Sequence, residues 1–232
     1  LPRAPDAVIV AEPTSLDVVV AHKGAVRWRC QARGRAAHSS APQAGDNAIY
    51  RMARVLGALE RYARDVAPTL GRHPLVGQPS LSVGLISGGV SVNTVPDRCT
   101  IEIDRRVLPG EDPRAAFQHV VEFVDREARN GPQVEHERPY LTSSGLSDEL
   151  SRSFASRLSE MIRHSGPSGG CLGVPYGTDA PAFAGAGIPT VVFGPGSIAQ
   201  AHTADEWIAI EQLHEATEIL YRFACQAWDA HA

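Results

Sequence analysis

The sequence lacks several patterns that mark large classes of protein. No apolar run approaches the ~18–20 residues of a membrane-spanning helix, and the first residues lack the apolar stretch of a signal peptide. The 22 basic and 26 acidic residues give a formal net charge of −4, so bulk attraction to nucleic acid or to an anionic membrane has no support. With 43% apolar and 21% charged residues, the composition is typical of a globular protein rather than a disordered chain or a coiled coil.

Motifs for several kinds of site are also missing. The four cysteines lie tens of residues apart without a Cys-x-x-Cys pair, so we expect neither a disulfide framework nor a zinc knuckle, but reduced thiols in a cytoplasmic protein. One Gly-x-Ser-x-Gly segment, residues 166–170, precedes Asp179 and His202 in the order of the α/β-hydrolase triad. That motif needs a strand before the serine and a helix after it. Here the predicted order is reversed, which disfavours a serine hydrolase.

The middle of the chain has the pattern of a two-layer unit. Val26, Trp28 and Cys30 alternate with polar residues, which predicts a half-buried strand. A helix, two strands, a second helix and a last strand are predicted to follow at residues 48–62, 81–85, 100–103, 112–130 and 133–137. The order β-α-β-β-α-β predicts a ferredoxin-like unit.

The two ends of the chain have a different pattern. Residues 7–11 form a short apolar run, typical of a strand buried on both faces. After the middle unit, helices alternate with apolar strands at residues 147–164, 171–174, 179–186, 188–194 and 208–228. This alternation favours a parallel sheet covered by helices. We therefore predict an α/β protein in which residues 1–22 and 139–232 are two pieces of one domain, with residues 23–138 inserted between them.

Two candidate functional residues follow predicted buried strands. Glu12 comes directly after the first strand, and His202 follows the strand at 188–194 across a Gly/Pro loop. Ligands gather at the carboxyl ends of strands in open α/β sheets, and imidazole is a common metal ligand and base. Glu12 could instead cap a helix or lie at the surface. Asp205 or Glu206 could orient His202, or cap the last helix.

Three further candidates lie in the predicted inserted unit. His38 lies in a loop with little apolar content, where functional residues concentrate, although a surface histidine is the alternative. Asn93 lies in a turn-rich segment and could be only a turn residue. Arg106 ends a strand, where a guanidinium can bind a substrate carboxylate with two hydrogen bonds. Its alternative is a surface ion pair with Asp104 or Glu111.

Six segments in order along the chain resemble one known family. They are Ala11-Glu12-Pro13-Thr14, residues 34–47 around His38, residues 89–96, residues 104–109, Gly177-Thr178-Asp179-Ala180, and residues 193–196 with His202. Together they resemble the M20 family of metallopeptidases and amidohydrolases, which includes acetylornithine deacetylase, succinyl-diaminopimelate desuccinylase, aminoacylase and carboxypeptidase G-type enzymes. The inserted ferredoxin-like unit matches the family's lid or dimerisation domain.

The resemblance implies a centre of two zinc ions, with cobalt or manganese as possible substitutes, that hydrolyses the amide of a small N-acyl amino acid or dipeptide. Glu12 and His202 match metal ligands. His38 matches the lid histidine that reaches the active site of the partner subunit and steadies the substrate carbonyl. Asn93, Arg106, Gly177 and Thr178 match residues that hold the substrate, which Arg106 contacts through its carboxylate. A homodimer through the lid domain is also implied.

The sequence departs from the family in its first part. Family members carry a His-x-Asp segment, a bridging aspartate and a Glu-Glu pair before the strand that matches residues 7–11, and this sequence has neither His-x-Asp nor Glu-Glu. The chain also begins at Leu1 rather than Met. We therefore expect the C-terminal portion of an M20 amidohydrolase, inactive by itself. The alternative is a non-catalytic dimerisation or binding module that keeps the fold, which an encoded start at or just before Leu1 would support.

Overall fold

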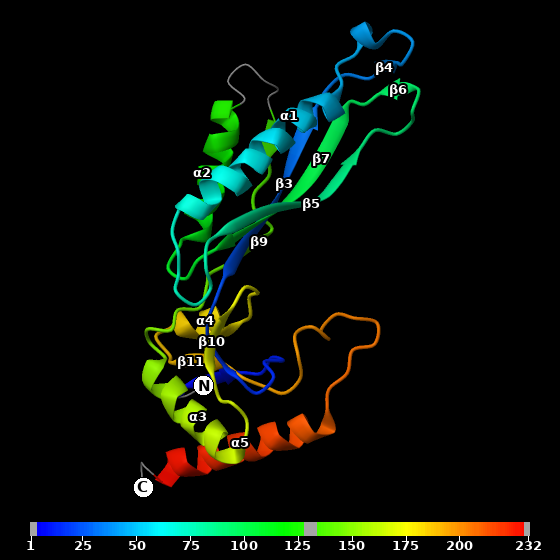
Figure 1. The fold of residues 1–232 in the computed structure, drawn as a ribbon. Coiled ribbons are helices and arrows are strands. Elements are labelled where there is room, and N and C mark those ends of the chain that lie inside the picture. Colours follow the sequence, from blue (N-terminus) through cyan, green and yellow to red (C-terminus); the bar gives the residue numbers. More distant parts are fainter. Residues whose placement is uncertain (1–3, 128–133, 230–232) are drawn as a thin grey trace. The chain divides into compact units, whose positions relative to one another are not determined.

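The computed structural model describes residues 4–127 and 134–229 (Figure 1). The chain forms two compact units, one of residues 1–22 and 145–232 and the other of residues 23–144. The second unit extends beyond residue 138, where we predicted its end, because strand β9 (Leu141–Ser143) pairs with strand β3 (Gly24–Arg33) of the same unit. No helix in the described ranges is long and apolar enough to cross a membrane.

The first unit contains a four-stranded sheet in the order β1-β11-β2-β10. These strands are β1 (Val8–Val10), β2 (Val18–His22), β10 (Cys171–Val174) and β11 (Thr190–Val192). The predicted parallel sheet is confirmed by the β1–β11 and β2–β10 pairs. Strand β2 was not predicted, and it runs antiparallel to β11, with Val192 opposite Val19.

Helices cover both faces of this sheet because β2 is buried on both sides. Val18 and Val20 pack with helices α3 (Arg152–Ser165) and α5 (Ile210–Asp229). Val19 packs in a second cluster with Ala180, the first residue of helix α4 (Ala180–Ala184). Helix α3 begins later than the predicted residue 147, because the preceding residues form a turn in which the Ser151 amide donates to the Asp148 carbonyl at 3.2 Å.

The second unit has the predicted ferredoxin-like topology. Its strands and helices, in chain order, are β3, β4 (Ala37–His38), η1 (Pro42–Ala44), α1 (Ala48–Arg61), η2 (Tyr62–Val66), η3 (Ala67–Thr69), β5 (Ser80–Gly88), β6 (Thr94–Val95), β7 (Arg98–Val107), α2 (Pro113–Glu127), β8 (Val134–His136) and β9. The main sheet has the order β5-β7-β3-β8, and each neighbouring pair is antiparallel. Strands β4 and β6 form a separate two-stranded sheet.

The core of the second unit lies between its sheet and helices α1 and α2. Val26, Trp28 and Cys30 of β3 face this core, as their alternation predicted. The Trp28 ring meets Phe117 of α2 edge to face at 5.1 Å, and its Nε1–H donates to His136 Nδ1 at 3.0 Å. Asn47 caps α1 by accepting the amides of the second and third helical residues. Both observations tie the helices to the positions that periodicity predicted.

Candidate functional site

Glu12 is held beside the end of β11 by backbone hydrogen bonds. The amides of Thr14 and Leu16 donate to the Gly194 carbonyl at 3.3 and 3.1 Å, and the Gly194 amide donates to Thr14 Oγ1 at 3.1 Å. A Cβ atom at position 194 would lie 2.6 Å from the Glu12 carbonyl oxygen. Glycine at this position therefore lets the backbone of Glu12 approach the strand end closely.

A hollow of about 380 Å³ lies at the carboxyl ends of β1 and β11. It is lined by Ala11, Glu12, Pro13, Pro195, Gly196, Ser197, Gln200, Ala201, Glu206, Trp207 and Ile208. Gln212 of α5 anchors the glycine loop, because its Oε1 accepts the Gly196 amide at 2.8 Å. The hollow thus lies where open α/β sheets bind ligands, with the half-buried Glu12 in its wall.

His202 is exposed and follows Ala201, which lines the hollow. Its backbone has a positive φ of 62°, a conformation that is uncommon for residues other than glycine. Its amide donates to Glu206 Oε2 at 3.2 Å. Glu206 therefore contacts the backbone of His202, and it precedes α5, which begins at Ile210 rather than at the predicted 208.

The metal ligands expected here form an incomplete set. Glu12 and His202 lie in segments on the two sides of the hollow, but no cluster of three or more His, Cys, Asp or Glu side chains in the described part of the chain could hold a metal ion. A catalytic zinc needs three protein ligands and one open position. The described residues therefore do not by themselves fit a zinc ion.

Thr178 is tied to a buried histidine that the sequence analysis did not select. His22, at the end of β2, is fully buried and its Nε2 lies 2.9 Å from Thr178 Oγ1. Thr178 Oγ1 also accepts the Ala180 amide at 3.1 Å. The position of His22 at the end of the apolar run 18–21 is the signal that could have identified it. These contacts hold Thr178, and with it Gly177, between β10 and α4.

Tyr176 is a second residue that the sequence analysis missed. Its pKa is raised, first by burial and then by the negative charge of Glu12. A charge effect of this kind requires proximity, so Tyr176 adds a phenol to the surroundings of Glu12. Nothing in the sequence pattern relates these two residues, because they lie in connections that follow different strands, β1 and β10.

In the second unit, the structure brings His38 and Asn93 together. His38 pairs with Thr94 across strands β4 and β6, and the Ser39 amide donates to the Asn93 carbonyl at 2.9 Å. Both residues are exposed. They lie at the tip of this unit that carries β4 and β6 (Figure 1). Sequence segments about 55 residues apart therefore form one cluster.

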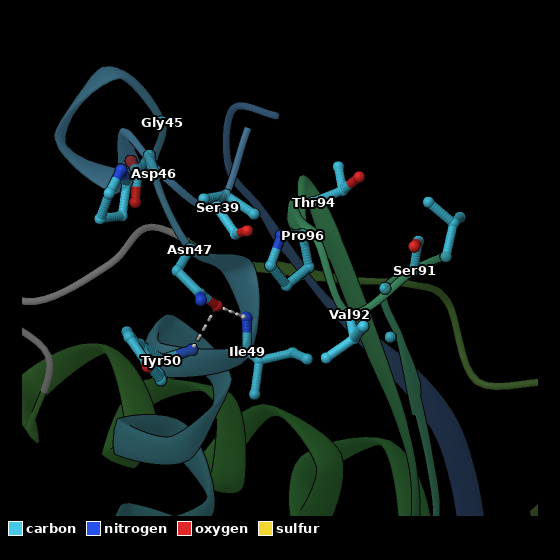
Figure 2. A pocket seen from close by; sticks show the side chains of 15 residues that line it. Ser39, Gly45, Asp46, Asn47, Ile49, Tyr50, Ser91, Val92, Thr94 and Pro96 are labelled. Carbon is cyan, nitrogen blue, oxygen red and sulfur yellow. Dashed lines mark hydrogen bonds between the residues drawn. The ribbon is translucent and has the colours of Figure 1, made fainter. Parts of the chain in front are cut away.

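A larger hollow of about 960 Å³ opens at the same tip. Figure 2 shows that Ser39, the Gly45–Asn47 turn and the start of α1 lie on one side of it, with Ser91, Val92, Thr94 and Pro96 on the other. Asn47, whose side chain caps α1, lies in this wall. Its lining therefore comes from the segments that flank His38 and Asn93.

Arg106 is paired with Asp104, which is one of the alternatives that the sequence left open. Arg106 Nε lies 2.9 Å from Asp104 Oδ1, and its Nη2 donates to Oδ2 at 3.0 Å. Arg27 Nε donates to the same carboxylate at 2.8 Å. Glu111 instead pairs with the buried Arg105 at 2.7 Å. Because a guanidinium has five N–H donors, Asp104 occupies one edge of Arg106 and leaves donors on the other.

Arg106 does not belong to the cluster of His38 and Asn93. These two residues lie beyond the Arg98 end of β7, whereas Arg106 lies near its other end, opposite Ala25. Eight residues of strand at ~3.3 Å each separate Arg106 from Arg98 by about 26 Å. One small substrate therefore cannot contact both places in the same copy of this unit.

The serine of the Gly-x-Ser-x-Gly segment has a structural role. Ser168 Oγ donates to Asp17 Oδ1 at 2.6 Å, and the Gly170 amide donates to the same oxygen at 3.0 Å. The segment connects helix α3 to strand β10, which is the reverse of the order that a nucleophile elbow needs. These contacts fix the entry of the chain into β10.

The chain is similar in sequence to known hydrolases. A family model described as "Peptidase dimerisation domain" matches residues 20–132. Acetylornithine deacetylase of Myxococcus xanthus is 32% identical over 220 residues, which cover 92% of this chain and 56% of that protein. A Mycobacterium tuberculosis protein assigned as a succinyl-diaminopimelate desuccinylase is 32% identical over 219 residues, 94% of this chain and 58% of that protein.

The chain belongs to the M20 family of peptidases and amidohydrolases. Its fold agrees: a Staphylococcus aureus tripeptidase matches 94% of this M20 chain, and 57% of its own length, with a TM-score of 0.72 and 20% identity. A Bacillus cereus aminopeptidase matches 91% of it, and 54% of its own length, with a TM-score of 0.67 and 23% identity. The M20 chain spans little more than half the length of the relatives that it matches.

Proposed function

We propose that this chain is part of a zinc-dependent M20 hydrolase that cleaves the amide bond of a small N-acyl amino acid or dipeptide. The hollow at the carboxyl ends of β1 and β11, with Glu12 in its wall and His202 next to its lining, is the observation that carries this proposal. The named activities of the relatives, deacetylation, desuccinylation and tripeptide cleavage, all break an amide bond in a small molecule. These activities support the proposed class of reaction, but they do not identify the acyl group that is removed.

The proposed metal centre needs more than the described residues provide. Glu12 and His202 are proposed to contribute one ligand each to a pair of zinc ions, for which cobalt or manganese could substitute. Since two donors do not hold a catalytic zinc, we propose that the remaining ligands and the general base come from polypeptide outside these 232 residues. The chain alone is then expected to be inactive.

Five candidate residues are proposed to contact the substrate. His38 and Asn93 would donate hydrogen bonds to the substrate carbonyl, and Gly177 and Thr178 would line the binding site. Arg106 would bind the substrate carboxylate with the edge of its guanidinium that Asp104 leaves available. Because Asp104 also pairs with Arg27, its charge is shared between two guanidinium groups, and Arg106 keeps part of its attraction for an anion.

A homodimer through the second unit is proposed for two reasons. The ~26 Å between Arg106 and the tip that carries His38 exceeds the length of a small substrate, so His38 and Asn93 would act on substrate held by a second copy. Strand β5 also lies at an edge of its sheet, with Leu85 64% and Ile86 57% exposed. Beside it, Ala53 and Gly57 of α1 line an apolar groove of about 490 Å³. An unprotected apolar edge of this kind favours association.

A cytoplasmic location is proposed as well. The four cysteines, Cys30, Cys99, Cys171 and Cys225, are all free thiols. Proteins in oxidising compartments tend to pair their cysteines, so free thiols at both buried and exposed positions favour a reducing compartment.

A second candidate function is a non-catalytic dimerisation or binding module. The absence of a three-donor metal cluster from the described residues favours it. Glu12 in the wall of a formed hollow favours the hydrolase, because a module that only dimerises has no use for a carboxylate in that place. The two candidates differ in metal content and turnover, which a single comparison can measure.

The test compares the 232-residue chain with the longest protein that its gene encodes. Zinc per chain and hydrolysis of N-acetyl amino acids, N-succinyl amino acids and dipeptides are measured for both. The hydrolase proposal expects about two zinc ions and turnover in the longer protein, and neither in the short chain. A longer protein that binds zinc but hydrolyses none of these substrates, or a gene that encodes no more than this chain, would favour the binding module.

The role of Arg106 is tested in the active protein by Arg106→Ala. Hydrogen bonds between charged groups contribute ~1.5–3 kcal/mol each, so KM for a substrate with a free carboxylate should rise about 10- to 100-fold, with little change for its amide analogue. Arg29→Ala is the matched control, because Arg29 of β3 forms a similar ion pair with Glu102 on the same face of the sheet as Arg106. Equal effects of both variants would refute the assignment of Arg106.

A further inference from the structure

His38 presents only one of its ring nitrogens to a ligand. Its Nδ1 accepts the backbone N–H of Ser40 at 3.2 Å, and Ser40 Oγ lies 2.7 Å from the same atom. A ring nitrogen that accepts an N–H carries no proton, so the neutral ring carries its proton on Nε2. The Ser40 hydroxyl then also donates to Nδ1. Both contacts come from the same residue and leave Nε2–H as the donor.

Asn93 is held in a corresponding way by a second serine. The Ser91 hydroxyl donates to Asn93 Oδ1. An asparagine amide has an acceptor oxygen and a donor NH₂ group, so this contact occupies its oxygen and leaves Nδ2 with two donor hydrogens. The backbone carbonyl of Asn93 is also occupied, because it accepts the Ser39 amide at 2.9 Å.

We propose that Ser40 and Ser91 are positioning residues that turn His38 and Asn93 into a pair of hydrogen-bond donors for one negatively polarised oxygen. Only the identity of that oxygen rests on the proposed function: if the protein hydrolyses amides, it is the carbonyl oxygen of the scissile amide. The occupation of His38 Nδ1 and Asn93 Oδ1 by serine groups is given by the hydrogen bonds of the described chain. Neither serine is assigned a substrate contact in this proposal.

The two serines matter because each candidate residue could otherwise present an acceptor. A neutral imidazole has one acceptor nitrogen, and an amide that rotates by half a turn exposes its oxygen. An acceptor facing a carbonyl oxygen would repel it as negative charge develops there. Donors that are fixed before the reaction stabilise that charge without reorganising, and hydroxyl groups from Ser40 and Ser91 fix them here.

The first test measures the tautomer of His38 in the 232-residue chain. Two-bond ¹H–¹⁵N spectra of histidine-labelled protein distinguish Nε2–H from Nδ1–H, and His38→Gln identifies the signal among the nine histidines. The wild-type ring should be the Nε2–H tautomer. Ser40→Ala removes one of two donors to Nδ1 and should shift the tautomer ratio about fivefold toward Nδ1–H, as expected for the loss of one hydrogen bond. Ser40→Thr should restore it.

A wild-type ring in the Nδ1–H form, or a ratio that Ser40→Ala leaves unchanged, would overturn the proposal for His38. Ser87→Ala is the matched control. Ser87 is an exposed serine of β5 whose side chain forms no hydrogen bond with the described residues. This measurement needs neither metal nor activity, so it can fail or succeed independently of the proposed function.

The second test uses the active longer protein and addresses Asn93. If Asn93 presents its Nδ2 group to the substrate oxygen, Asn93→Asp replaces a hydrogen-bond donor by an anion. The kcat of Asn93→Asp should then be at least 10-fold lower than that of Asn93→Ala. Ser91→Ala should lower kcat about 3- to 10-fold with little change in KM, and Ser91→Thr should recover it. An Asn93→Asp variant as active as wild type would overturn the donor role. If the longer protein has no amidase activity, the proposed function fails, and the tautomer result alone decides the positioning role of Ser40.

Discussion

The replacement Gly194→Ala should damage the candidate site by moving its backbone rather than by removing a side chain. The added Cβ would lie 2.6 Å from the Glu12 carbonyl oxygen, and contacts under 3.0 Å are essentially never observed for real Cβ atoms. The two segments must therefore separate by at least 0.4 Å, the difference between these two distances. The Glu12 oxygen belongs to the backbone, so no flexible side chain can yield.

The cost of this separation can be estimated from the hydrogen bonds across it. Overpacking alone costs ~1–3 kcal/mol. The bonds between Thr14, Leu16 and Gly194 also lengthen from 3.1–3.3 Å, and a lost buried bond costs ~1 kcal/mol. A total of about 2–4 kcal/mol is expected, which corresponds to a decrease on the order of 10 °C in the thermal midpoint of a unit of this size.

Hydrogen exchange measured by mass spectrometry is the appropriate assay, because it reports on the two units separately. Gly194→Ala should speed exchange of peptides that cover residues 12–18 and 190–197 and leave those of β3 and β7 unchanged. Gly84→Ala is the control, since its Cβ would meet nothing within 4 Å. If Gly194→Ala proved as stable as Gly84→Ala, with unchanged exchange around Glu12, the argument that this glycine holds the site together would be refuted.

Three other predictions concern pH, association and metal. Burial lowers the pKa of His136 below its ordinary 6.5, so the unfolded state binds the proton more readily. The stability of the second unit should therefore fall as the pH decreases from about 7 to about 5, and His136→Gln, which can still accept the Trp28 N–H, should flatten this dependence in denaturant titrations. Leu85→Lys with Ile86→Lys should convert the proposed dimer to monomer in light scattering, without loss of the Trp28 fluorescence that marks a folded unit. Addition of EDTA should leave the thermal midpoint of the 232-residue chain unchanged, because only the loss of a ligand bound to the native state would lower this midpoint. A decrease of several degrees would refute the claim that this chain has too few ligands to hold a metal ion.

The second unit could be predicted from the sequence because its signals are local. The alternation of Val26, Trp28 and Cys30 and the cap at Asn47 each depend on neighbouring residues, and both were confirmed. Strand β2 was missed, although its five residues are all buried. Its formation as a strand depends on partners far away in the chain, since it pairs with Cys171–Val174 and with Val192. The spacing of apolar residues within one segment cannot predict such pairings.

For the candidate residues, the sequence could predict only what local patterns carry, and their proposed roles stay predictions. The positions of Glu12 and His202 follow from polar residues placed after apolar runs, which is a local pattern. The partner of Arg106 could be narrowed to two carboxylates, of which Asp104 is the one found. The contact of His22 with Thr178 and the effect of the Glu12 charge on the pKa of Tyr176 could not be predicted. They relate residues at or just beyond the ends of β1, β2 and β10, so the order of these strands in the sheet has to be known first.

The two groups of candidate residues are incomplete in different ways, and this difference bears on how the protein would work. Around Glu12 there is a hollow but too few metal ligands among the described residues. At the tip of the second unit, His38 and Asn93 have their acceptor atoms occupied and their donors exposed, but Arg106 lies about 26 Å away along β7. A group of hydrogen-bond donors without an anion to bind is stable in water, whereas two donors are too few to hold a catalytic zinc ion. Under the proposed hydrolase function, these donors would therefore form before association, and completion of the metal site would be the step that controls activity.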